Sequence, residues 1–542
     1  MDNLRFVLFI LLIFLGVMMW QQWQLDYGPK PETDATAKLD VPPTTNGMGT
    51  PVTKPLPTDP EDTPVMSAIR HQRISVTTDV VRMEIDSEGG DIRQLDLLHY
   101  PEDKDKPDQL VRLFADDKDY FVAQSGFLGD GASAPSHHTQ WQTAATEYTL
   151  ANGQNSLRIP LTWSNGQGLK IVKTYVLERG SYKIGMEQQV ENQGQETWRG
   201  RQYVQLQRKD PGDKNKNQFI RTFTGGVLYT PETKYEKISF GDMADKNLSA
   251  KSEQGWVAMI QHYFLAAWIP ASGQENNFYT KSLPDAHYVI GSYSAPQSVP
   301  VEESKTFKTE LFAGPKLQRI LEETAPGLEL TVDYGNLTVA AKPIFWLLEK
   351  FHSLSNNWGV AIILVTLTLK ALFFRLSASS YKSMANMRKL QPKLAELKER
   401  YGANKQEFNM KMMELYRKEK VNPLGGCLPI LVQIPVFIAL YWVLIETVEM
   451  RQAPFFLWIN DLSSKDPYFI LPGLMVISMY FQQKLSPPPS DPMQAKVMQF
   501  FPFIFGVMFL FFPSGLVLYW VVNNLLSIAQ QWYINRMIEK TA

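Results

Sequence analysis

The C-terminal third of this chain contains five apolar segments, each long enough to cross a lipid bilayer as a helix. A hydrocarbon core about 30 Å thick needs roughly 20 apolar residues at ~1.5 Å per residue. Each backbone polar group in lipid must be paired within the protein, and a helix achieves this within one segment. The sequence therefore predicts transmembrane helices over residues 357–376, 425–446, 467–484, 496–512 and 515–534.

A sixth apolar run lies in residues 1–27, after Arg5. A cleavable signal peptide carries small residues soon after its apolar core. Here bulky residues follow the core, and the small-residue stretch from Ala35 to Ala37 lies well downstream. These features favour a retained N-terminal transmembrane anchor over a signal peptide. We therefore expect a polytopic α-helical membrane protein with six transmembrane helices and both termini on one side.

The middle of the chain differs in composition and in sequence pattern. Residues 28–65 are dominated by proline, threonine and charge, as expected of a disordered linker. Residues 66–330 contain segments such as RISVTTDVVRMEI and LKIVKTYVLE, in which apolar and polar residues alternate. We expect a large antiparallel β-sandwich domain over 66–330. Its polar residues explain why the mean hydropathy of the whole chain is only -0.21.

The remaining residues, 331–542, begin with an amphipathic segment at 341–354. Its apolar residues share one helical face, whereas charged residues occupy much of the rest. This pattern is typical of a helix that lies in the membrane interface. A helix packed on the β-domain is the alternative.

Charge in the loops predicts the orientation of the segments. Residues 378–420 contain eleven Lys and Arg residues, whereas the loop between the third and fourth segments contains only Arg451 and Lys465. The positive-inside rule places 378–420 in the cytoplasm. Both termini are then cytoplasmic, and residues 24–340 are periplasmic.

The cytoplasmic loop 378–420 is itself patterned. Two apolar stripes at helical spacing are separated by the turn sequence YGANKQ, which predicts a helical hairpin. Its basic surface suits an acidic or ribosomal partner. The alternative is an ordinary solvated face whose charge only sets the topology.

Lys370 lies inside the apolar segment 357–376. A charge near the bilayer centre costs at least ~2.5–3.5 kcal/mol and is a functional-site hypothesis. Counted inward from Trp358, Lys370 lies roughly 18 Å into the hydrocarbon core, past its midplane. A lysine at this depth can also snorkel to the cytoplasmic surface. This segment alone leaves both interpretations open.

The other segments favour a functional role for Lys370. No Asp or Glu lies within the core of any later apolar segment, so the lysine has no acidic partner there. A cation without a counter-ion needs water. Polar residues recur at helical spacing in the same segments, and we expect them to line a hydrated groove open to the cytoplasm. The groove residues are Thr366, Lys370, Gln433, Tyr519, Asn523 and Ser527.

Other classes of function find little support. The sequence contains no GxxxxGK[ST], HExxH or GxSxG motif, and it has one cysteine and a net charge of -1. Ser379 and Lys382 have the spacing of Ser-Lys catalysis but no supporting motif. We therefore expect that this protein is not an enzyme and that it binds no cofactor and no metal. The alternative function, a small-solute transporter or channel, would require inverted repeats and paired ionisable residues at the midplane, which we do not find.

Five long segments carry a resemblance to a known family: NPLGGCLPILVQIPVF, RQAPFFLWINDLS, DPYFILPGLM, SDPMQAKVMQFFPFIF and FPSGLVLYWVVNNLLSIAQQ. They closely resemble the YidC insertases, the bacterial branch of the Oxa/Alb family. The N-terminal anchor and outer domain resemble the long form of Gram-negative bacteria. The resemblance implies an inner-membrane protein insertase and chaperone with a five-helix core, whose groove is closed toward the periplasm.

The resemblance also implies residue roles. The family's groove carries a positive residue, often Arg, at the position of Lys370. Substrate contacts in the family map to Gln433, Ile434 and Phe437, and to Tyr519 and Trp520. The outer domain resembles a galactose-mutarotase-type β-sandwich, without implying sugar chemistry.

The implied partners are nascent membrane proteins, the Sec translocon and the lipid bilayer. Ribosomes and targeting factors are expected to bind through the 378–420 hairpin, and we expect no nucleic-acid binding by the chain itself. The tail ends at RMIEKTA, without the long basic extension of some members. This difference argues against strong ribosome binding through the tail.

Overall fold

The structure is a computed structural model that describes residues 72–129, 134–212, 222–402, 404–419, 421, 428–485 and 492–540. The predicted anchor 1–27 and linker 28–65 lie outside the described residues. The chain divides into two compact units. An outer unit comprises the β-rich chain up to Thr338 together with Ile445–Gln452, and a helical unit comprises Val339–Leu444 and the chain from Ala453 onward.

Among the described residues, the larger sheet of the outer unit has eleven strands. Every pair in it is antiparallel except β1–β6, which is parallel. The main order is β13 (Ser249–Ser252), β16 (Asn276–Leu283), β17 (His287–Ser294), β10 (Trp198–Lys209), β5 (Phe121–Gly129), β3 (Ile92–Asp103), β2 (Val81–Asp86), β1 (Arg73–Thr77) and β6 (Glu147–Thr149), with β18 (Gln297–Val299) on β10 and β4 (Lys106–Phe114) on β3.

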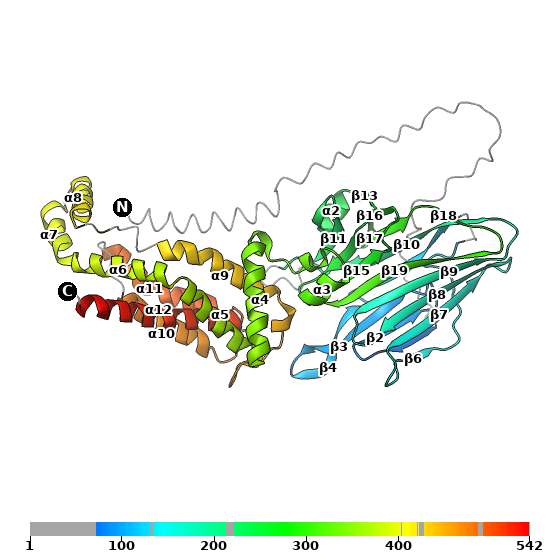
Figure 1. The fold of residues 1–542 in the computed structure, drawn as a ribbon, viewed down its shortest axis with the longest axis horizontal. Helices are drawn as coiled ribbons and strands as arrows, with labels where there is room; N and C mark the ends of the chain where they lie inside the picture. Colours follow the sequence, from blue (N-terminus) through cyan, green and yellow to red (C-terminus); the bar gives the residue numbers. More distant parts are fainter. Residues whose placement is uncertain are drawn as a thin grey trace, which may run out of the picture. The chain divides into compact units, whose positions relative to one another are not determined.

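The second sheet has eight strands among the described residues, and all its pairs are antiparallel. Its order is β12 (Lys234–Ile238), β11 (Gly225–Thr230), β14 (Trp256–Ile260), β15 (Phe264–Pro270), β19 (Glu303–Pro315), β9 (Lys183–Asn192), β8 (Leu169–Glu178) and β7 (Ser156–Ser164). The predicted antiparallel β-rich domain is therefore confirmed (Figure 1).

The period-two pattern of the sequence determines which side chains fill the space between the sheets. In β8, alternate residues beginning with Leu169 are buried, and the intervening ones are more exposed. The indole of Trp268 in the smaller sheet donates a 3.1 Å hydrogen bond to the carbonyl of Gln205 in the larger sheet. The sheets thus pack face to face as a sandwich.

Short helices complete the outer unit: α2 (Phe240–Asp245), α3 (Gln318–Thr324) and the 3-10 turns η3 (Leu328–Thr331), η4 (Gly335–Leu337) and η6 (Val448–Met450). Ser239 caps α2, and its hydroxyl and backbone amide are paired reciprocally with Asp242. Helix α3 lies in the segment near the end of the domain.

The segment Ile445–Gln452 belongs to the outer unit although it follows an apolar helix in sequence. Arg451 donates to the carbonyls of Pro101 and Glu102 at 2.7 and 3.1 Å. The His262 ring lies 3.0 Å from the carbonyl of Ile445. Strand β3 and the residues around β15 therefore hold this segment, which nothing in the local sequence pattern predicts.

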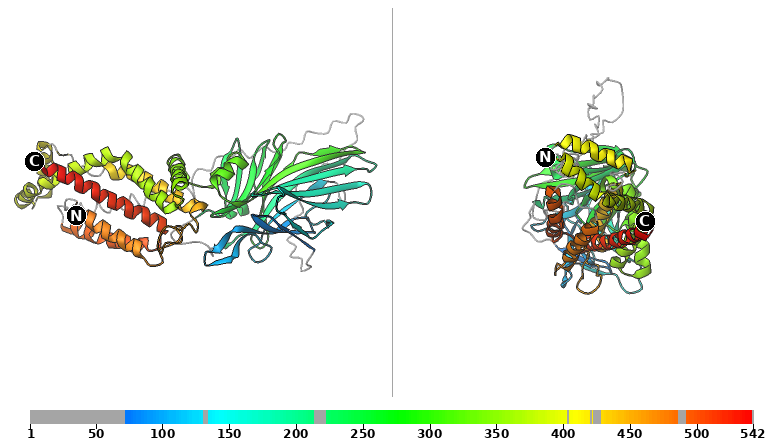
Figure 2. Two further views of the ribbon diagram at one scale, coloured as in Figure 1. Left: turned by 60° about the horizontal axis from the view of Figure 1, so that its bottom comes forward. Right: turned by 90° about the vertical axis from the view of Figure 1, so that its left-hand side faces the viewer.

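The helical unit contains nine α-helices among the described residues: α4 (Thr338–Ser355), α5 (Trp358–Leu372), α6 (Phe374–Lys389), α7 (Gln391–Tyr401), α8 (Lys405–Lys418), α9 (Leu428–Glu446), α10 (Ile470–Leu485), α11 (Pro492–Phe509) and α12 (Ser514–Lys540). The axes of helices α5 and α9–α12 are roughly aligned, so that these helices form a bundle, whereas the axis of α4 lies across them (Figures 1 and 2).

The structure divides residues 357–420 differently from the sequence prediction. The sequence predicts a transmembrane helix over 357–376 followed by a helical hairpin over 378–420, but α5 ends at Leu372 and α6 continues to Lys389. The two helices meet at a 66° bend. Neither proline nor glycine lies at the break, and the Gln530 amide of α12 donates to the carbonyl of Phe374 at 3.4 Å. Packing against α12 thus accompanies a bend that local propensity does not predict.

The helical hairpin itself consists of α7 and α8, with Leu390 and Leu394 buried between them and their neighbours. An ion pair of 2.6 Å joins Lys393 to Glu419. The hairpin therefore begins at Gln391 rather than at 378.

No helix within the described ranges is, taken singly, both long and apolar enough to cross a bilayer. Helices α5 and α6 meet this requirement only when taken together across their bend. The predicted number of transmembrane helices remains a prediction.

Candidate functional site

A hollow lies among α5, α6, α9 and α12 of the helical unit. Its volume is about 410 Å³, part of which is open to solvent. Five of its lining residues are among the predicted groove residues, and they come from three helices far apart in sequence. These five are Thr366, Lys370, Gln433, Tyr519 and Asn523.

Within the part of the chain that the structure describes, Lys370 is the one charged residue that lines this hollow. Its ammonium donates a 2.7 Å hydrogen bond to the Ser527 hydroxyl of α12, which in turn donates to the carbonyl of Asn523. No carboxylate of the described residues lies within ion-pair distance of the Lys370 ammonium. The lysine therefore presents a half-buried cation with a neutral partner.

The polar residues of α9 and α12 meet directly across the hollow. The Gln433 amide donates to the side-chain oxygen of Asn523 at 2.7 Å. Thr366 is buried and donates to the carbonyl of Ile362 in its own helix at 2.7 Å. The hydroxyl of Thr366 is thus partnered locally, whereas Gln433 and Asn523 tie two helices together.

Aromatic residues form the wall beyond the polar pair. The Phe437 ring of α9 stacks on Tyr519 with centroids 6.0 Å apart, and it meets Trp520 edge-on at 4.4 Å. Ile434 is 44% exposed and does not line the hollow. The structure therefore brings Phe437 into contact with Tyr519 and Trp520 but leaves Ile434 outside.

Five further residues complete the lining: Leu369, Phe373, Leu376, Ser377 and Val436. Leu376 and Ser377 belong to α6, and the bend at Phe373 keeps them beside the hollow. Ser377 lies seven residues after Lys370, a spacing that would put both on one face of an unbroken helix, but in the structure the bend lies between the two residues. The apolar members carry no comparable sequence signal.

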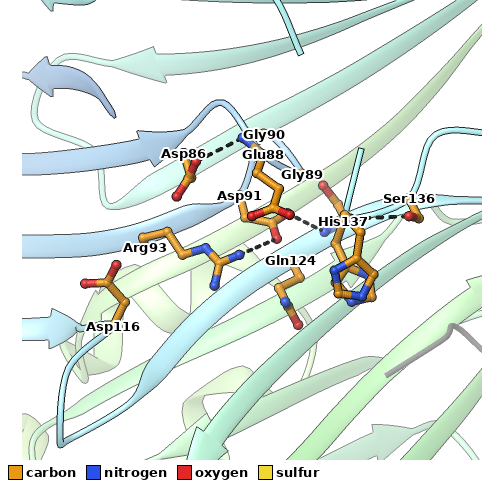
Figure 3. Close-up of polar contacts among 12 residues, drawn as sticks. Asp86, Glu88, Gly89, Gly90, Asp91, Arg93, Asp116, Gln124, Ser136 and His137 are labelled. Carbon is orange, nitrogen blue, oxygen red and sulfur yellow. Dashed lines mark hydrogen bonds and ion pairs between the residues drawn. The ribbon is translucent and has the colours of Figure 1, made fainter. Parts of the chain in front are cut away.

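The outer unit holds a second cluster of buried polar residues, on β2, β3, β5 and the loop before β6 (Figure 3). Asp91 is fully buried, accepts a 3.2 Å hydrogen bond from the Ser125 amide and lies 3.7 Å from Arg93. Burial raises the pKa of Asp91 to about 6, although Arg93 and Lys173 oppose the shift. No group of three metal-ligating side chains occurs in the described part of the chain.

Large apolar side chains are exposed along α10, α11 and α12 of the helical unit. Exposed apolar surfaces larger than those of typical soluble monomers mark sites of protein or membrane contact. The exposed side chains include Leu474, Ile477, Phe481, Phe500, Phe503, Ile504, Val507, Leu525, Trp532 and Tyr533. The fold and the site together define a class of helical protein with a polar hollow, many exposed apolar side chains and an antiparallel β-domain in the same chain.

Comparison with known proteins identifies the family. The family model for the YidC periplasmic domain matches residues 73–347, and the model for the 60Kd inner membrane protein matches residues 350–541. The chain belongs to the YidC family, whose members are inner membrane proteins with a periplasmic domain.

Curated relatives match along the whole chain. Membrane protein insertase YidC of Methylococcus capsulatus is 62% identical, with 100% of this chain and 99% of the relative covered. The protein of the same name from Nitrosococcus oceani is 48% identical, with both chains fully covered. The family assignment made from the sequence motifs is thus confirmed.

Solved structures align more weakly. A crystal structure of an active YidC insertase is 19% identical, with 85% of this chain and 93% of that chain covered and a TM-score of 0.39. A galactose mutarotase-related enzyme from Lactobacillus acidophilus is 9% identical, with 44% and 97% covered and a TM-score of 0.31. At these scores neither alignment carries an argument, and the likeness of the outer domain to mutarotases remains a prediction.

Proposed function

We propose that this chain is a membrane protein insertase and chaperone in which the Lys370 hollow receives the polar flank of a nascent segment. The observation that carries the proposal is a half-buried cation in a hollow partly open to solvent, where the hydroxyl of Ser527 is its one hydrogen-bond partner among the described residues. Such a cation keeps unused capacity for an anionic guest. No enzymatic step or cofactor is part of the proposal.

The energy for the transfer comes from two sources. The apolar part of the guest gains free energy on moving into lipid, at roughly 25 cal/mol per Å² of apolar surface removed from water. The membrane potential acts on the charges of the translocated flank, by about 2.3 kcal/mol per charge for 100 mV. Lys370 attracts acidic flanks because a charge interacts more strongly in a low-dielectric site.

In the proposed membrane arrangement, the chain crosses the inner membrane six times, with both termini in the cytoplasm and residues 24–340 in the periplasm. The lysine- and arginine-rich chain between α5 and α9 supports this orientation. The apolar surface of α10–α12 would face lipid. The crosswise direction of α4 supports an interfacial position for this helix (Figure 1).

The proposed partners are nascent membrane proteins, the Sec translocon, and ribosomes or targeting factors. The α7–α8 hairpin would receive the last group, since its exposed surface includes Lys398, Arg400, Arg417 and Lys418.

The test is insertion by the full chain reconstituted in liposomes, without ATP. The substrates form a series of small single-span proteins whose translocated flank carries from none to three acidic residues. We expect Lys370→Ala to lower insertion of the most acidic flank about fivefold, the equivalent of ~1 kcal/mol for one cation. Lys370→Arg should retain insertion because charge and reach survive, and Lys370→Glu should be the worst for acidic flanks.

The matched control is Lys382→Ala, which removes an exposed lysine of α6 that does not line the hollow. This variant should insert the whole series like the parent protein. Equal losses for all flanks in Lys370→Ala, or no loss, would overturn the role of the charge in the hollow. Flux of small solutes without insertion would instead support the alternative function, a transporter or channel.

A further inference from the structure

A second hollow lies at the opposite end of α6 from the bend, where α6, α10 and α12 come together. Helix α12 runs beside both of the other helices (Figure 2). The volume of the hollow is about 660 Å³, part of it open to solvent. Its lining consists of Met384, Ala385, Arg388, Lys389, Leu485, Gln531 and Asn535.

The lining combines two cations with two amides. Arg388 and Lys389 are exposed in the last turn of α6, and neither forms an ion pair with a carboxylate of the described residues. Gln531 is buried and donates to the carbonyl of Leu485 at 3.1 Å, which joins α12 to the end of α10. An arginine and a lysine side by side, with the Asn535 amide in the same lining, match the chemistry of a phosphate group.

The surface beside this hollow has the composition of a membrane interface. On α10, the Lys484 ammonium lies 4.7 Å from the centre of the Tyr480 ring. On α12, the Arg536 guanidinium lies 5.3 Å from the Trp532 ring, and Trp532 is 54% exposed. Aromatic rings with neighbouring long cations are enriched where headgroups meet hydrocarbon.

We propose that this hollow binds the phosphate of an anionic phospholipid, with its acyl chains along the exposed apolar faces of α10 and α12. The inference rests on the membrane embedding in the proposed function, but it concerns a site separate from the Lys370 hollow. Lipid is favoured over an acidic peptide or RNA because Phe481, Trp532 and Tyr533 lie exposed on the adjoining turns. Those side chains suit acyl chains, whereas a soluble polyanion would leave them uncovered.

The experiment measures lipid retention rather than insertion. The full chain, purified in a neutral detergent, is mixed with equal amounts of phosphatidylglycerol and phosphatidylcholine of identical acyl chains, and native mass spectrometry counts the lipids retained. We expect about tenfold preference for phosphatidylglycerol. The double variant Arg388→Gln with Lys389→Gln should bring this ratio close to one.

Two further variants make the test specific. Arg417→Gln with Lys418→Gln removes the same two residue types from α8, outside the hollow, and should leave the preference unchanged. Asn535→Asp keeps both cations but adds a negative charge to the lining, and should also abolish the preference. This variant covers the case in which the double variant at 388 and 389 fails to fold.

Three outcomes would overturn the proposal. In the first, the preference for phosphatidylglycerol survives in the variants at 388, 389 and 535. In the second, the α8 control loses this preference to the same extent, which would mean a general effect of charge. Alternatively, inorganic phosphate at the lipid's concentration displaces the lipid completely, which would mean a soluble-anion site. Because insertion is not the readout, each result stands whether or not the flank-charge series supports the Lys370 mechanism.

Discussion

Two buried or half-buried lysines, one in each unit, differ in how their charges are partnered. Lys173 of β8 is fully buried, and its ammonium donates to the carbonyl of Gly89 at 2.6 Å and to the carbonyl and hydroxyl of Ser125 at 3.2 and 3.0 Å. It also lies 4.8 Å from the Trp141 ring. Among the described residues, the Lys370 ammonium has one hydrogen bond, to Ser527, and it borders a hollow.

The difference separates a structural charge from an available one. An ammonium has three donors, and three acceptors surround that of Lys173. Burial lowers the pKa of Lys173 to about 8, although the nearby carboxylate of Asp91 favours the charged form of the lysine. Lys370 retains donors for water or a guest. Saturated contacts therefore indicate a role in folding, and unsaturated contacts beside a hollow indicate a role in binding.

The largest expected effect comes from removing the fully hydrogen-bonded ammonium of Lys173. Lys173→Met should lower the local unfolding free energy of β8 and β5 by about 3–5 kcal/mol, because it leaves the Gly89 and Ser125 acceptors buried without their donor and removes a positive charge near the buried Asp91. Hydrogen exchange of the full chain measures this loss. The matched control, Lys170→Met, removes a surface lysine of the same strand that pairs with Glu191, and should cost no more than about 1 kcal/mol. Equal effects in the two variants would refute the distinction.

The pH dependence of the outer unit provides the next largest effect. Burial raises the pKa of Asp91 to about 6 from the unfolded value of 3.8, so the folded state binds the proton more tightly. This contribution to stability is present below about pH 4 and is lost as the pH rises through 6, by at most about 3 kcal/mol. Hydrogen exchange of β3 between pH 4 and 7 measures the slope. Asp91→Asn should remove it, and an unchanged slope would assign the effect to another group.

Lys370, whose hydrogen-bonding capacity is only partly used, should contribute far less to folding stability. Lys370→Met is expected to change the stability of α5 and α12 by about 1 kcal/mol or less, because one hydrogen bond to a neutral hydroxyl is lost. Hydrogen exchange of these helices in detergent checks the prediction. A loss as large as that for Lys173→Met would mean that Lys370 is a structural residue, and the comparison between the two lysines would fail.

The smallest expected effect concerns the amide pair across the hollow. In a double-mutant cycle of Gln433→Leu and Asn523→Leu, we expect a coupling energy of about 0.6 kcal/mol, which is typical of polar contacts between membrane helices. Denaturant unfolding in mixed micelles supplies the four stabilities. A coupling energy above about 2 kcal/mol would place this pair with Lys173 as structural.

Part of this arrangement could be predicted from local sequence. The strand sequence LKIVKTYVLE places Lys173 among Leu169, Ile171 and Tyr175 on the apolar face, a signal that identifies a buried lysine without a structure. The groove residues of α12 were predicted from their helical spacing. Neither pattern says which acceptors meet the two ammonium groups, because those acceptors come from segments more than 45 residues away.

Other features had no local signal. The helix break at Phe373 occurs without proline or glycine, and the attachment of Ile445–Gln452 to the outer unit depends on carbonyls about 350 residues earlier in the chain. The sequence alone identifies Arg388 and Lys389 only as part of a charged loop. The enclosure of the hollow beside them depends on α10 and α12, which follow about 100 and 140 residues later.

By itself, the sequence determined the class of each element and the chemistry available to it. Period-two alternation produces strands with one buried face, long apolar runs produce helices, and the absence of acids from the core of the apolar segments leaves Lys370 without a local counter-ion. Only the tertiary structure determines that all three donors of the Lys173 ammonium meet acceptors, whereas those of Lys370 do not. The reason is that hydrogen bonds act only over about 3 Å, so the packing of distant segments determines whether a charge is enclosed or left open to a guest.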